Sequence, residues 1–328
     1  MQILVTGGAG YIGSHVVHAL VDAGEEVVVV DDLSTGRRDL LPEEAELVVG
    51  DIGDEALLDE VLTPEVDAVM HFAGSIVVPE SVEDPLSYYL NNTAKTRTLI
   101  EWCVRRGVHQ FIFSSTAAVY GQPDHCPVTE STPTAPINPY GRSKLMTEWM
   151  LEDTARATGL RYVALRYFNV AGADPAGRTG QATPDATHLI KVTTQTALGL
   201  RPHLSIFGTD YPTADGTCIR DYIHVTDLAD AHIRTLHHLR GGSASRVFNC
   251  GYQRGFSVRQ VVDAVKRVSG VDFDVRQAPR RAGDPPELVA DATAIRDNLD
   301  WTPRYDDLDT IVETALNWER RLVDSGDE

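Results

Sequence analysis

Short apolar runs alternate with longer amphipathic stretches through the first half of the chain. The runs that predict buried strands are residues 3–6, 27–30, 47–49, 68–72, 110–114 and 162–165. Because these runs are apolar throughout, we expect strands that are covered on both faces by the helices between them. The first half therefore predicts an α/β fold with a Rossmann-type, doubly wound parallel sheet.

The second half of the chain has a different pattern. After Asn169 comes a stretch rich in loop residues, with Gly172, Pro175 and Gly177, and then mixed short elements that lead to a helix over residues 306–320. We predict a first domain over residues 1–172 and a smaller C-terminal domain over residues 173–328. The run at 247–250 predicts one more strand of either domain, so segments near 220–250 are candidates to return to the first.

Composition and charge limit the classes of partner. The chain has 328 residues, 42% of them hydrophobic, which is enough to fill a sizeable core. Its 29 basic and 48 acidic residues give a net charge of -19. This charge repels nucleic acid and anionic membranes, so we expect neither as a partner, and an anionic ligand has to be met by local groups.

Cysteines and the amino terminus indicate where the protein works. The four cysteines, at 103, 126, 218 and 250, have no metal-site spacing, and we expect reduced thiols and no bound metal. The sequence starts directly with the first strand, without a basic leader or a long apolar segment. We therefore expect a cytoplasmic protein.

A glycine-rich segment follows the first strand. Residues 6–13 read TGGAGYIG, which places Gly7, Gly10 and Gly13 between a strand and a helix. Glycines allow a tight turn, and the free amides at the start of the helix attract a pyrophosphate. The second strand ends in Asp31 and Asp32, where a carboxylate accepts ribose hydroxyls and repels a 2'-phosphate. We predict a site for NAD rather than NADP.

Other polar segments end at the same edge of the predicted sheet. Asp51 follows the third strand, and the segment 72–74, Phe-Ala-Gly, follows the fourth. Ligands of doubly wound sheets bind at the carboxyl ends of the strands. Each of these residues, taken singly, is equally compatible with an ordinary loop.

Asn138 to Lys144 contains the spacing YxxxK at the start of a predicted helix. A spacing of four places Tyr140 and Lys144 on one face. A tyrosine with a pKa of about 10 is a weak base at neutral pH, so we expect the Lys144 ammonium and the nicotinamide to lower it. A lowering of about three units corresponds to about 4 kcal/mol. Thr116 follows the fifth strand and is placed to bridge a substrate hydroxyl and the phenolate.

Alone, YxxxK is also compatible with a structural tyrosine and a surface lysine. Because it follows a predicted dinucleotide-binding loop in this sequence, we favour a catalytic role.

The segments TGGAGYIG, SSTAAVYG and YGRSK resemble the extended short-chain dehydrogenase/reductase family. Three further segments, LRYFNVAG, GTDYPTADGTCIRDYIHVTDLADAH and RRAGDPPELVADA, resemble the UDP-glucose 4-epimerases within that family, over essentially the whole chain.

This resemblance implies an NAD-binding domain followed by a UDP-sugar-binding domain. It implies that Tyr140 takes a proton from the sugar 4'-hydroxyl, directly or through Thr116, while NAD takes the hydride from C4'. The resulting 4-ketopyranose then turns and receives the hydride on its other face, which interconverts UDP-galactose and UDP-glucose. The resemblance also implies a homodimer that is joined through helices near residues 84–107 and 139–158.

The resemblance also implies site residues, position by position. The residues that match NAD contacts are Tyr11, Ile12, Asp31, Asp32, Leu33, Ser34, Thr35, Gly36, Asp51, Ile52, Phe72, Ala73, Gly74, Ser75, Ile76, Asn92, Thr116, Tyr140, Lys144 and Phe168. Those that match contacts to the UDP-sugar are Thr116, Asn169, His188, Leu189, Ser205, Ile206, Phe207, Arg220, Arg281, Asp284 and Leu288. The two arginines also make sense from first principles, because an acidic protein needs placed guanidinium groups to hold a pyrophosphate.

Three residues depart from the family pattern. Ile76 stands where a lysine is common, and His188 stands where asparagine is often found. An imidazole still forms hydrogen bonds to phosphate or sugar, but its charge depends on pH. Leu288 stands at a position that gates sugar size, which leaves the acceptance of N-acetylated sugars open.

Rival functions differ at few residues. A sugar 4,6-dehydratase needs an acid and a base directly after the threonine, and Ala117 and Ala118 stand there instead. An epimerase for UDP-glucuronate or a UDP-pentose stays open, since only a few pocket residues need to differ. A catalytically silent NAD-binding protein is disfavoured by the joint presence of Tyr140, Lys144 and Thr116.

Overall fold

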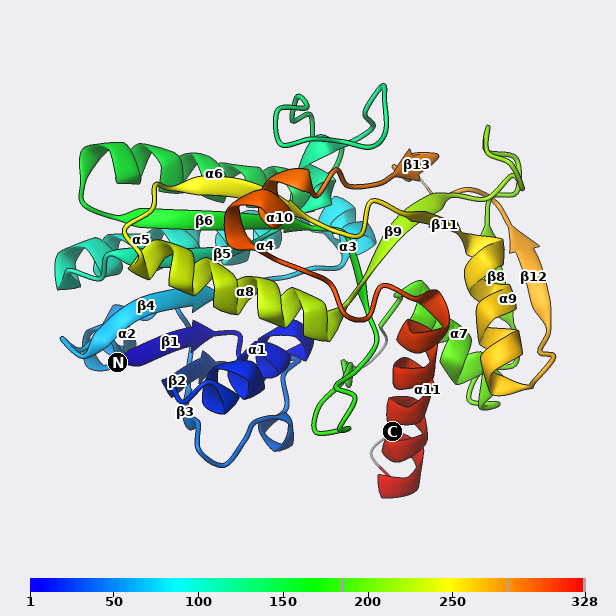
Figure 1. Ribbon diagram of the computed structural model, residues 1–328, viewed down its shortest axis with the longest axis horizontal. Coiled ribbons are helices and arrows are strands. Elements are labelled where there is room, and N and C mark those ends of the chain that lie inside the picture. Colours follow the sequence, from blue (N-terminus) through cyan, green and yellow to red (C-terminus); the bar gives the residue numbers. More distant parts are fainter. Residues whose placement is uncertain (184–185, 282, 327–328) are drawn as a thin grey trace.

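A seven-stranded parallel sheet forms the centre of the molecule in the computed structural model, which describes residues 1–183, 186–281 and 283–326 (Figure 1). Its strand order is β10-β6-β5-β4-β1-β2-β3. The strands are β1 Gln2–Thr6, β2 Glu26–Asp31, β3 Glu46–Val49, β4 Val66–His71, β5 Gln110–Thr116, β6 Arg161–Tyr167 and β10 Arg246–Cys250. The six strands predicted in the first half are confirmed, as is the Rossmann-type fold class.

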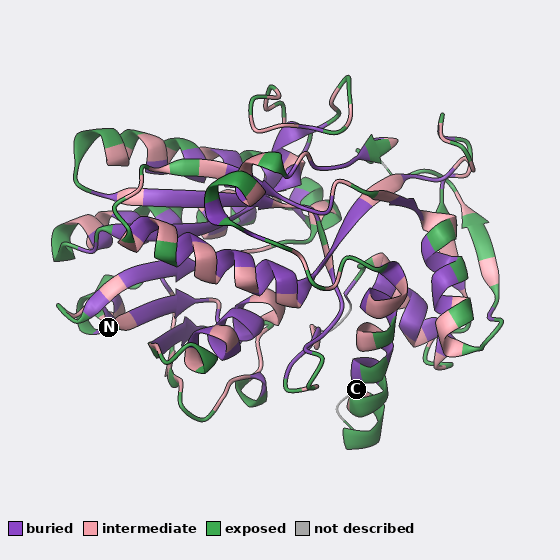
Figure 2. Cartoon of the chain, in the orientation of Figure 1, coloured by how far each residue is buried: buried purple, intermediate pink, exposed green. Residues whose placement is uncertain are grey.

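Helices cover both faces of this sheet. One face carries α1 Tyr11–Asp22 and α8 Val225–Arg240, and the other carries α2 Glu55–Val61, α5 Lys95–Arg106 and α6 Pro139–Ala157. Successive residues of a strand point to opposite faces, so Ile3 packs on the α1 side and Leu4 on the α5 side. Both are fully buried, and the strands appear purple through the middle of Figure 2. This double burial explains why the strand sequences are apolar without alternation.

A short, irregular helical region precedes α5. It consists of α3 Val78–Glu83, α4 Pro85–Tyr88 and a π-helical turn at Tyr89–Ala94. Short 3-10 turns lie at Arg38–Leu40 and Ala117–Tyr120. The second of these turns follows β5 directly and so helps to shape the carboxyl edge of the sheet.

The rest of the chain forms a smaller part with two further sheets, at the right of Figure 1. In one sheet, β9 Ile219–His224 pairs with β7 Asn169–Ala171, β11 Gly255–Ser257 and β13 Glu287–Leu288. In the other, β8 Leu204–Phe207 pairs with β12 Val275–Ala278. The helices here are α7 Leu189–Ala197, α9 Val258–Ser269 and α11 Leu308–Ser325, whereas α10 Thr293–Leu299 packs beside α8 and β10 of the main sheet region. Helix α11 confirms the helix predicted over 306–320.

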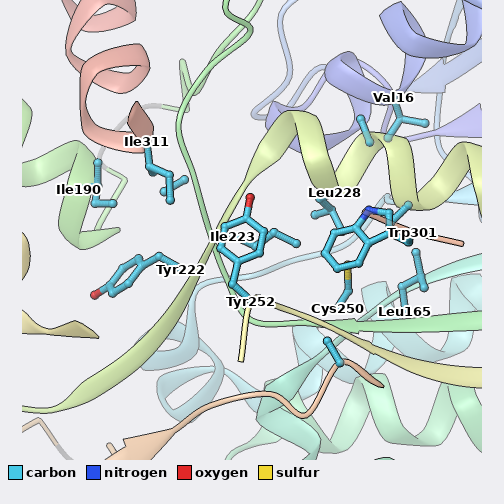
Figure 3. Packing of buried hydrophobic residues seen from close by; sticks show 14 of the residues in the cluster. Val16, Leu165, Ile190, Tyr222, Ile223, Leu228, Cys250, Tyr252, Trp301 and Ile311 are labelled. Carbon is cyan, nitrogen blue, oxygen red and sulfur yellow. The ribbon is translucent and has the colours of Figure 1, made fainter. Parts of the chain in front are cut away.

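One hydrophobic core joins the two parts. The same cluster contains Val16 and Leu165 of the main sheet region and Ile190 and Ile311 of the smaller part (Figure 3). Strand β10 lies beyond residue 172, yet it pairs with β6. We therefore propose that the domain built on the main sheet consists of two segments, residues 1–172 and residues 225–250.

Among the residues that the structure describes, no helix is long and apolar enough to cross a membrane. In the same described ranges, no group of three or more His, Cys, Asp or Glu side chains is arranged to hold a metal ion. The ends of the strands that carry the predicted site residues lie at the carboxyl edge of the main sheet.

Candidate active site

The glycine loop connects β1 to α1 at that edge. Gly7 has a φ of +70°, and its amide donates to the Val30 carbonyl at 2.8 Å. A Cβ on Gly13 would lie 2.2 Å from the Gly7 carbonyl oxygen, so only glycine fits there. No side chain caps α1 at Gly10, which leaves the first amides of the helix, at Tyr11 and Ile12, for an anionic group.

Asp31 braces this loop from the end of β2. Its carboxylate accepts hydrogen bonds from the amides of Ala9 and Leu33, both at 2.9 Å. Burial raises the pKa of Asp31 and these amide bonds oppose the rise. Asp32 in turn accepts bonds from the amide and hydroxyl of Ser34. The two acids thus shape the loop that runs through Thr35 and Gly36, in addition to any contact with a ribose.

The other predicted cofactor residues lie at the ends of β3 and β4. Asp51 forms an ion pair of 2.5 Å with Lys95 and precedes the buried Ile52. The amides of Phe72 and Ala73 both donate to the Thr6 carbonyl, which places this segment against the glycine loop.

Asn92 ties the segment after β4 to the helix that carries the tyrosine. Its Oδ1 accepts from the Ser75 amide at 2.7 Å, and its Nδ2 donates to the Ser75 carbonyl and to the Ser143 hydroxyl. A Cβ on Gly74 would lie 2.8 Å from the same Asn92 oxygen. Ile76, at the end of the segment, is 45% exposed. Asn92 therefore connects the cofactor edge with α6.

Tyr140 lies in the first turn of α6, where Asn138 caps the helix by accepting from the Gly141 amide at 2.8 Å. The phenol is buried and forms a hydrogen bond with the Thr116 hydroxyl, at the end of β5. Burial, and then the neighbouring Tyr167, raise the pKa of Tyr140, while the Thr116 bond lowers it. The structure thus brings together the tyrosine and threonine that the sequence singled out.

Lys144 is buried one turn further along α6. Its ammonium donates to the Ser114 carbonyl at 3.2 Å and lies 5.0 Å from the centre of the Phe113 ring. Burial lowers the pKa of Lys144 to about 8. Burial is the largest influence on the pKa of Tyr140, and the Lys144 ammonium is directed at the Ser114 carbonyl, so the lowering expected from Lys144 together with the nicotinamide stays a prediction.

The predicted substrate residues form two groups on the smaller part. On one side, Asn169 at the start of β7 lines a cavity together with His188 and Leu189 at the start of α7. On the other side, the Arg281 guanidinium lies 4.0 Å from the centre of the Phe207 ring. Phe207 ends β8, which also carries Ser205 and Ile206.

Arg220, Asp284 and Leu288 make up the rest of the second group. Arg220 lies 3.6 Å from the Asp284 carboxylate and pairs with Leu288 across β9 and β13. Leu288 packs in one buried cluster with Phe168 and with Ala117, the neighbour of Thr116. The proposed gate for sugar size is therefore next to the proposed catalytic residues.

The comparisons with known proteins agree with this arrangement. The sequence model of the NAD dependent epimerase/dehydratase family matches residues 3–251. The chain belongs to this family.

Several similar proteins within this family are UDP-glucose 4-epimerases. A UDP-glucose 4-epimerase of Azospirillum brasilense is 64% identical over 325 residues, which cover 99% of this chain and 93% of the relative. A solved crystal structure of a UDP-glucose 4-epimerase is 48% identical, covers 98% of each chain and superposes with a TM-score of 0.95. The crystal structure of the Brucella ovis UDP-glucose 4-epimerase in complex with NAD is 46% identical, covers 97% of this chain and 98% of that one, and has a TM-score of 0.93.

Sequence reasoning missed a buried polar network behind the epimerase/dehydratase site. Glu148, one turn after Lys144, forms an ion pair of 2.6 Å with Arg166 of β6 and accepts a 2.5 Å bond from the Ser115 hydroxyl. Arg166 also donates to the Tyr120 hydroxyl at 2.9 Å. The network fixes α6 to the strand end that carries Thr116. Arg166, near the end of the largely apolar strand β6, was the signal that pointed to a buried partner.

Proposed function

We propose that this chain interconverts UDP-galactose and UDP-glucose through a transient 4-ketopyranose, with NAD as its bound cofactor. The observation that carries the proposal is the placement of the buried Tyr140, in the first turn of α6, beside Thr116 at the end of β5, at the edge of the sheet where the glycine loop lies. Nearly full-length relatives with the name UDP-glucose 4-epimerase support it.

The residues of the cofactor edge fit a dinucleotide. The loop at 7–13 has no room for a Cβ at Gly7 or Gly13, and α1 begins with uncapped amides that suit a pyrophosphate. Asp31 ends β2 and Asp32 follows it directly, as expected for a ribose that carries free hydroxyls. Bound NAD supplies the hydride acceptor and donor for the sugar C4' and a positive charge that favours the phenolate form of Tyr140.

The protein groups handle the proton and the orientation. Tyr140 accepts the proton of the 4'-hydroxyl, directly or through Thr116, and returns it after the ketopyranose has turned over. The Lys144 ammonium, held by the Ser114 carbonyl, adds positive charge to this corner of the site. Arg220 and Arg281 hold the diphosphate while the sugar turns. The reaction requires that the enzyme binds the UDP moiety tightly and the sugar weakly, so that the sugar can rotate.

A neighbouring reaction class is disfavoured by the same residues. Elimination of the sugar 6'-hydroxyl needs an acid and a base beside the threonine, and the 3-10 turn after Thr116 carries Ala117 and Ala118 instead. With alanines at these two positions, no acid and base follow the threonine to expel water from the ketopyranose. Epimerisation is the outcome that the side chains support.

We also propose that the protein works as a cytoplasmic homodimer. Apolar side chains are exposed on the irregular helical region and on α6, with Leu86 at 77%, Leu90 at 58% and Trp149 at 54%. An isologous contact of these helices would cover them. Sedimentation analysis tests the dimer, and a Trp149→Glu variant that sediments like wild type would remove this surface from it.

The activity is tested with purified protein and UDP-galactose, with no added reductant. Chromatography should show UDP-glucose, and the protein should carry NAD absorbance without added cofactor. The same assay with UDP-N-acetylglucosamine, UDP-glucuronate and UDP-xylose measures how the Leu288 position limits the sugar. If only a UDP-pentose or a uronate were converted, the proposal would give way to that narrower epimerase.

A further inference from the structure

The imidazole of His188 has one hydrogen-bond partner in the part of the chain that the structure describes. His188 stands at the N-cap position of α7, but its side chain does not cap the helix. Instead, its Nδ1 lies 2.8 Å from Nε2 of Gln181. Both residues line the same cavity as Asn169 and Leu189. The opposite ring nitrogen, Nε2, makes no hydrogen bond within the described residues.

Gln181 is held firmly in this position. Its carbonyl oxygen accepts from the Lys191 ammonium at 2.8 Å and from the Trp318 indole at 3.3 Å. Lys191 in turn forms an ion pair of 2.5 Å with Glu319, and both side chains are about 5% exposed or less. Since Lys191 lies on α7 and Trp318 and Glu319 on α11, two packed helices fix the backbone from which the Gln181 amide extends.

The Gln181 contact selects one form of the imidazole. A carboxamide nitrogen only donates, so Nδ1 must accept and carries no proton. A neutral ring then has its proton on Nε2. Desolvation, and then the nearby Lys191 ammonium, lower the pKa of His188, so the neutral ring is the form near pH 7. Lys191 also pairs with Glu319, which offsets part of the positive charge that acts on His188.

We propose that Gln181 is a positioning residue that fixes His188 as a neutral donor at Nε2, aimed at an oxygen of the UDP moiety. This inference rests on the proposed function, because it assumes that UDP binds against the start of α7, where His188 lies. It explains how histidine replaces an asparagine amide at this position, since both then present one neutral N–H. Because the ring stays neutral, the affinity for UDP should not vary with the titration of His188, in contrast to the expectation from the sequence.

The first test reads the tautomer directly. Two-dimensional 1H–15N spectra of histidine-labelled protein saturated with UDP, with His188 assigned from the His188→Asn variant, should show a protonated Nε2 and an unprotonated Nδ1. A protonated Nδ1 would overturn the inference, because it requires the Gln181 amide to accept rather than donate.

The second test is a double-mutant cycle in calorimetric titrations with UDP. Gln181→Leu should raise the Kd for UDP roughly fivefold, about the net value of the neutral Gln181–His188 hydrogen bond that orders the ring, and leave kcat nearly unchanged. In the His188→Asn background the same substitution should have less than a roughly twofold effect, because asparagine needs no tautomer fixed. An equal loss in both backgrounds would show that Gln181 acts on the cavity as a whole and would refute the positioning role.

A matched control separates this inference from the proposed function. Gln110→Leu removes another buried glutamine that donates one bond, to Asp67 at 3.1 Å, but at the opposite end of β5. It should leave UDP binding unchanged. If wild-type protein fails to bind UDP, the proposed function fails. If wild type binds UDP and Gln181→Leu binds it equally well, only the positioning role fails.

Discussion

The buried ion pair between Glu148 and Arg166 gives the sharpest test of how the site is supported. Arg166 donates from Nε at 3.0 Å and from Nη2 at 2.6 Å to the carboxylate, and both side chains are 7% exposed or less. Glu148→Gln removes one charge and leaves the guanidinium buried beside a neutral amide. Breaking a buried pair from one side costs about 3–5 kcal/mol, and we expect the lower end because one amide oxygen still accepts.

The same substitution on the same helix provides the control. Glu152 pairs with Arg156 on the surface of α6, where the two side chains are 47% and 69% exposed. Glu152→Gln should therefore change stability by no more than about 0.5 kcal/mol.

Urea unfolding measures both variants. With a slope of about 3 kcal/mol/M, the midpoint should fall by about 1 M for Glu148→Gln and by less than about 0.2 M for Glu152→Gln. The kcat of Glu148→Gln should fall as well, because its partner Ser115 precedes Thr116. Equal midpoints for the two variants would refute the claim that this pair is desolvated and essential to the packing of α6.

Three further predictions concern acid stability, cofactor retention and the pH profile. Four buried histidines have pKa values lowered by burial to about 3 or 4: His15, His71, His224 and His232. In the unfolded chain these histidines bind protons below about pH 6.5, whereas in the folded chain they stay neutral down to about pH 4. Each histidine should therefore lower the free energy of unfolding by about 1.4 kcal/mol per pH unit between these values. A Tm that stays constant from pH 7 to 5 would contradict this. Gly13→Ala places a Cβ 2.2 Å from a backbone oxygen and should abolish the NAD absorbance of purified protein, whereas Gly159→Ala, with a nearest contact of 3.6 Å, should retain it. The Lys144 ammonium, with its pKa lowered to about 8, should be lost above that pH, so kcat should fall there, and Lys144→Arg should remove that falling limb.

The sheet and its cofactor edge follow from local features of the sequence. A strand that is buried on both faces has to be apolar at every position, so runs such as residues 27–30 stand out from their surroundings. Gly13 is recognisable because no side chain fits beside the Gly7 carbonyl. YxxxK places Tyr140 and Lys144 on one face of α6, because a helical spacing of four fixes their common face.

The protonation states and the supporting contacts were not accessible in the same way. The Tyr140 pKa depends on burial and on where the Lys144 ammonium points, and neither is encoded in the spacing of the two residues. The Gln181–His188 contact depends on how α11 packs against α7, about 130 residues away. Short strands such as β13 carry too few residues to show a period, and only their pairing with β9 defines them.

The central claim is that one carbon of the sugar is oxidised and then reduced within one protein-bound complex. Its most direct test uses UDP-galactose that carries deuterium at C4', with turnover in ordinary water and an excess of unlabelled NAD. The account predicts UDP-glucose that retains the deuterium at C4', with none in the solvent or in the free dinucleotide. Loss of the label to either pool on each turnover would contradict it.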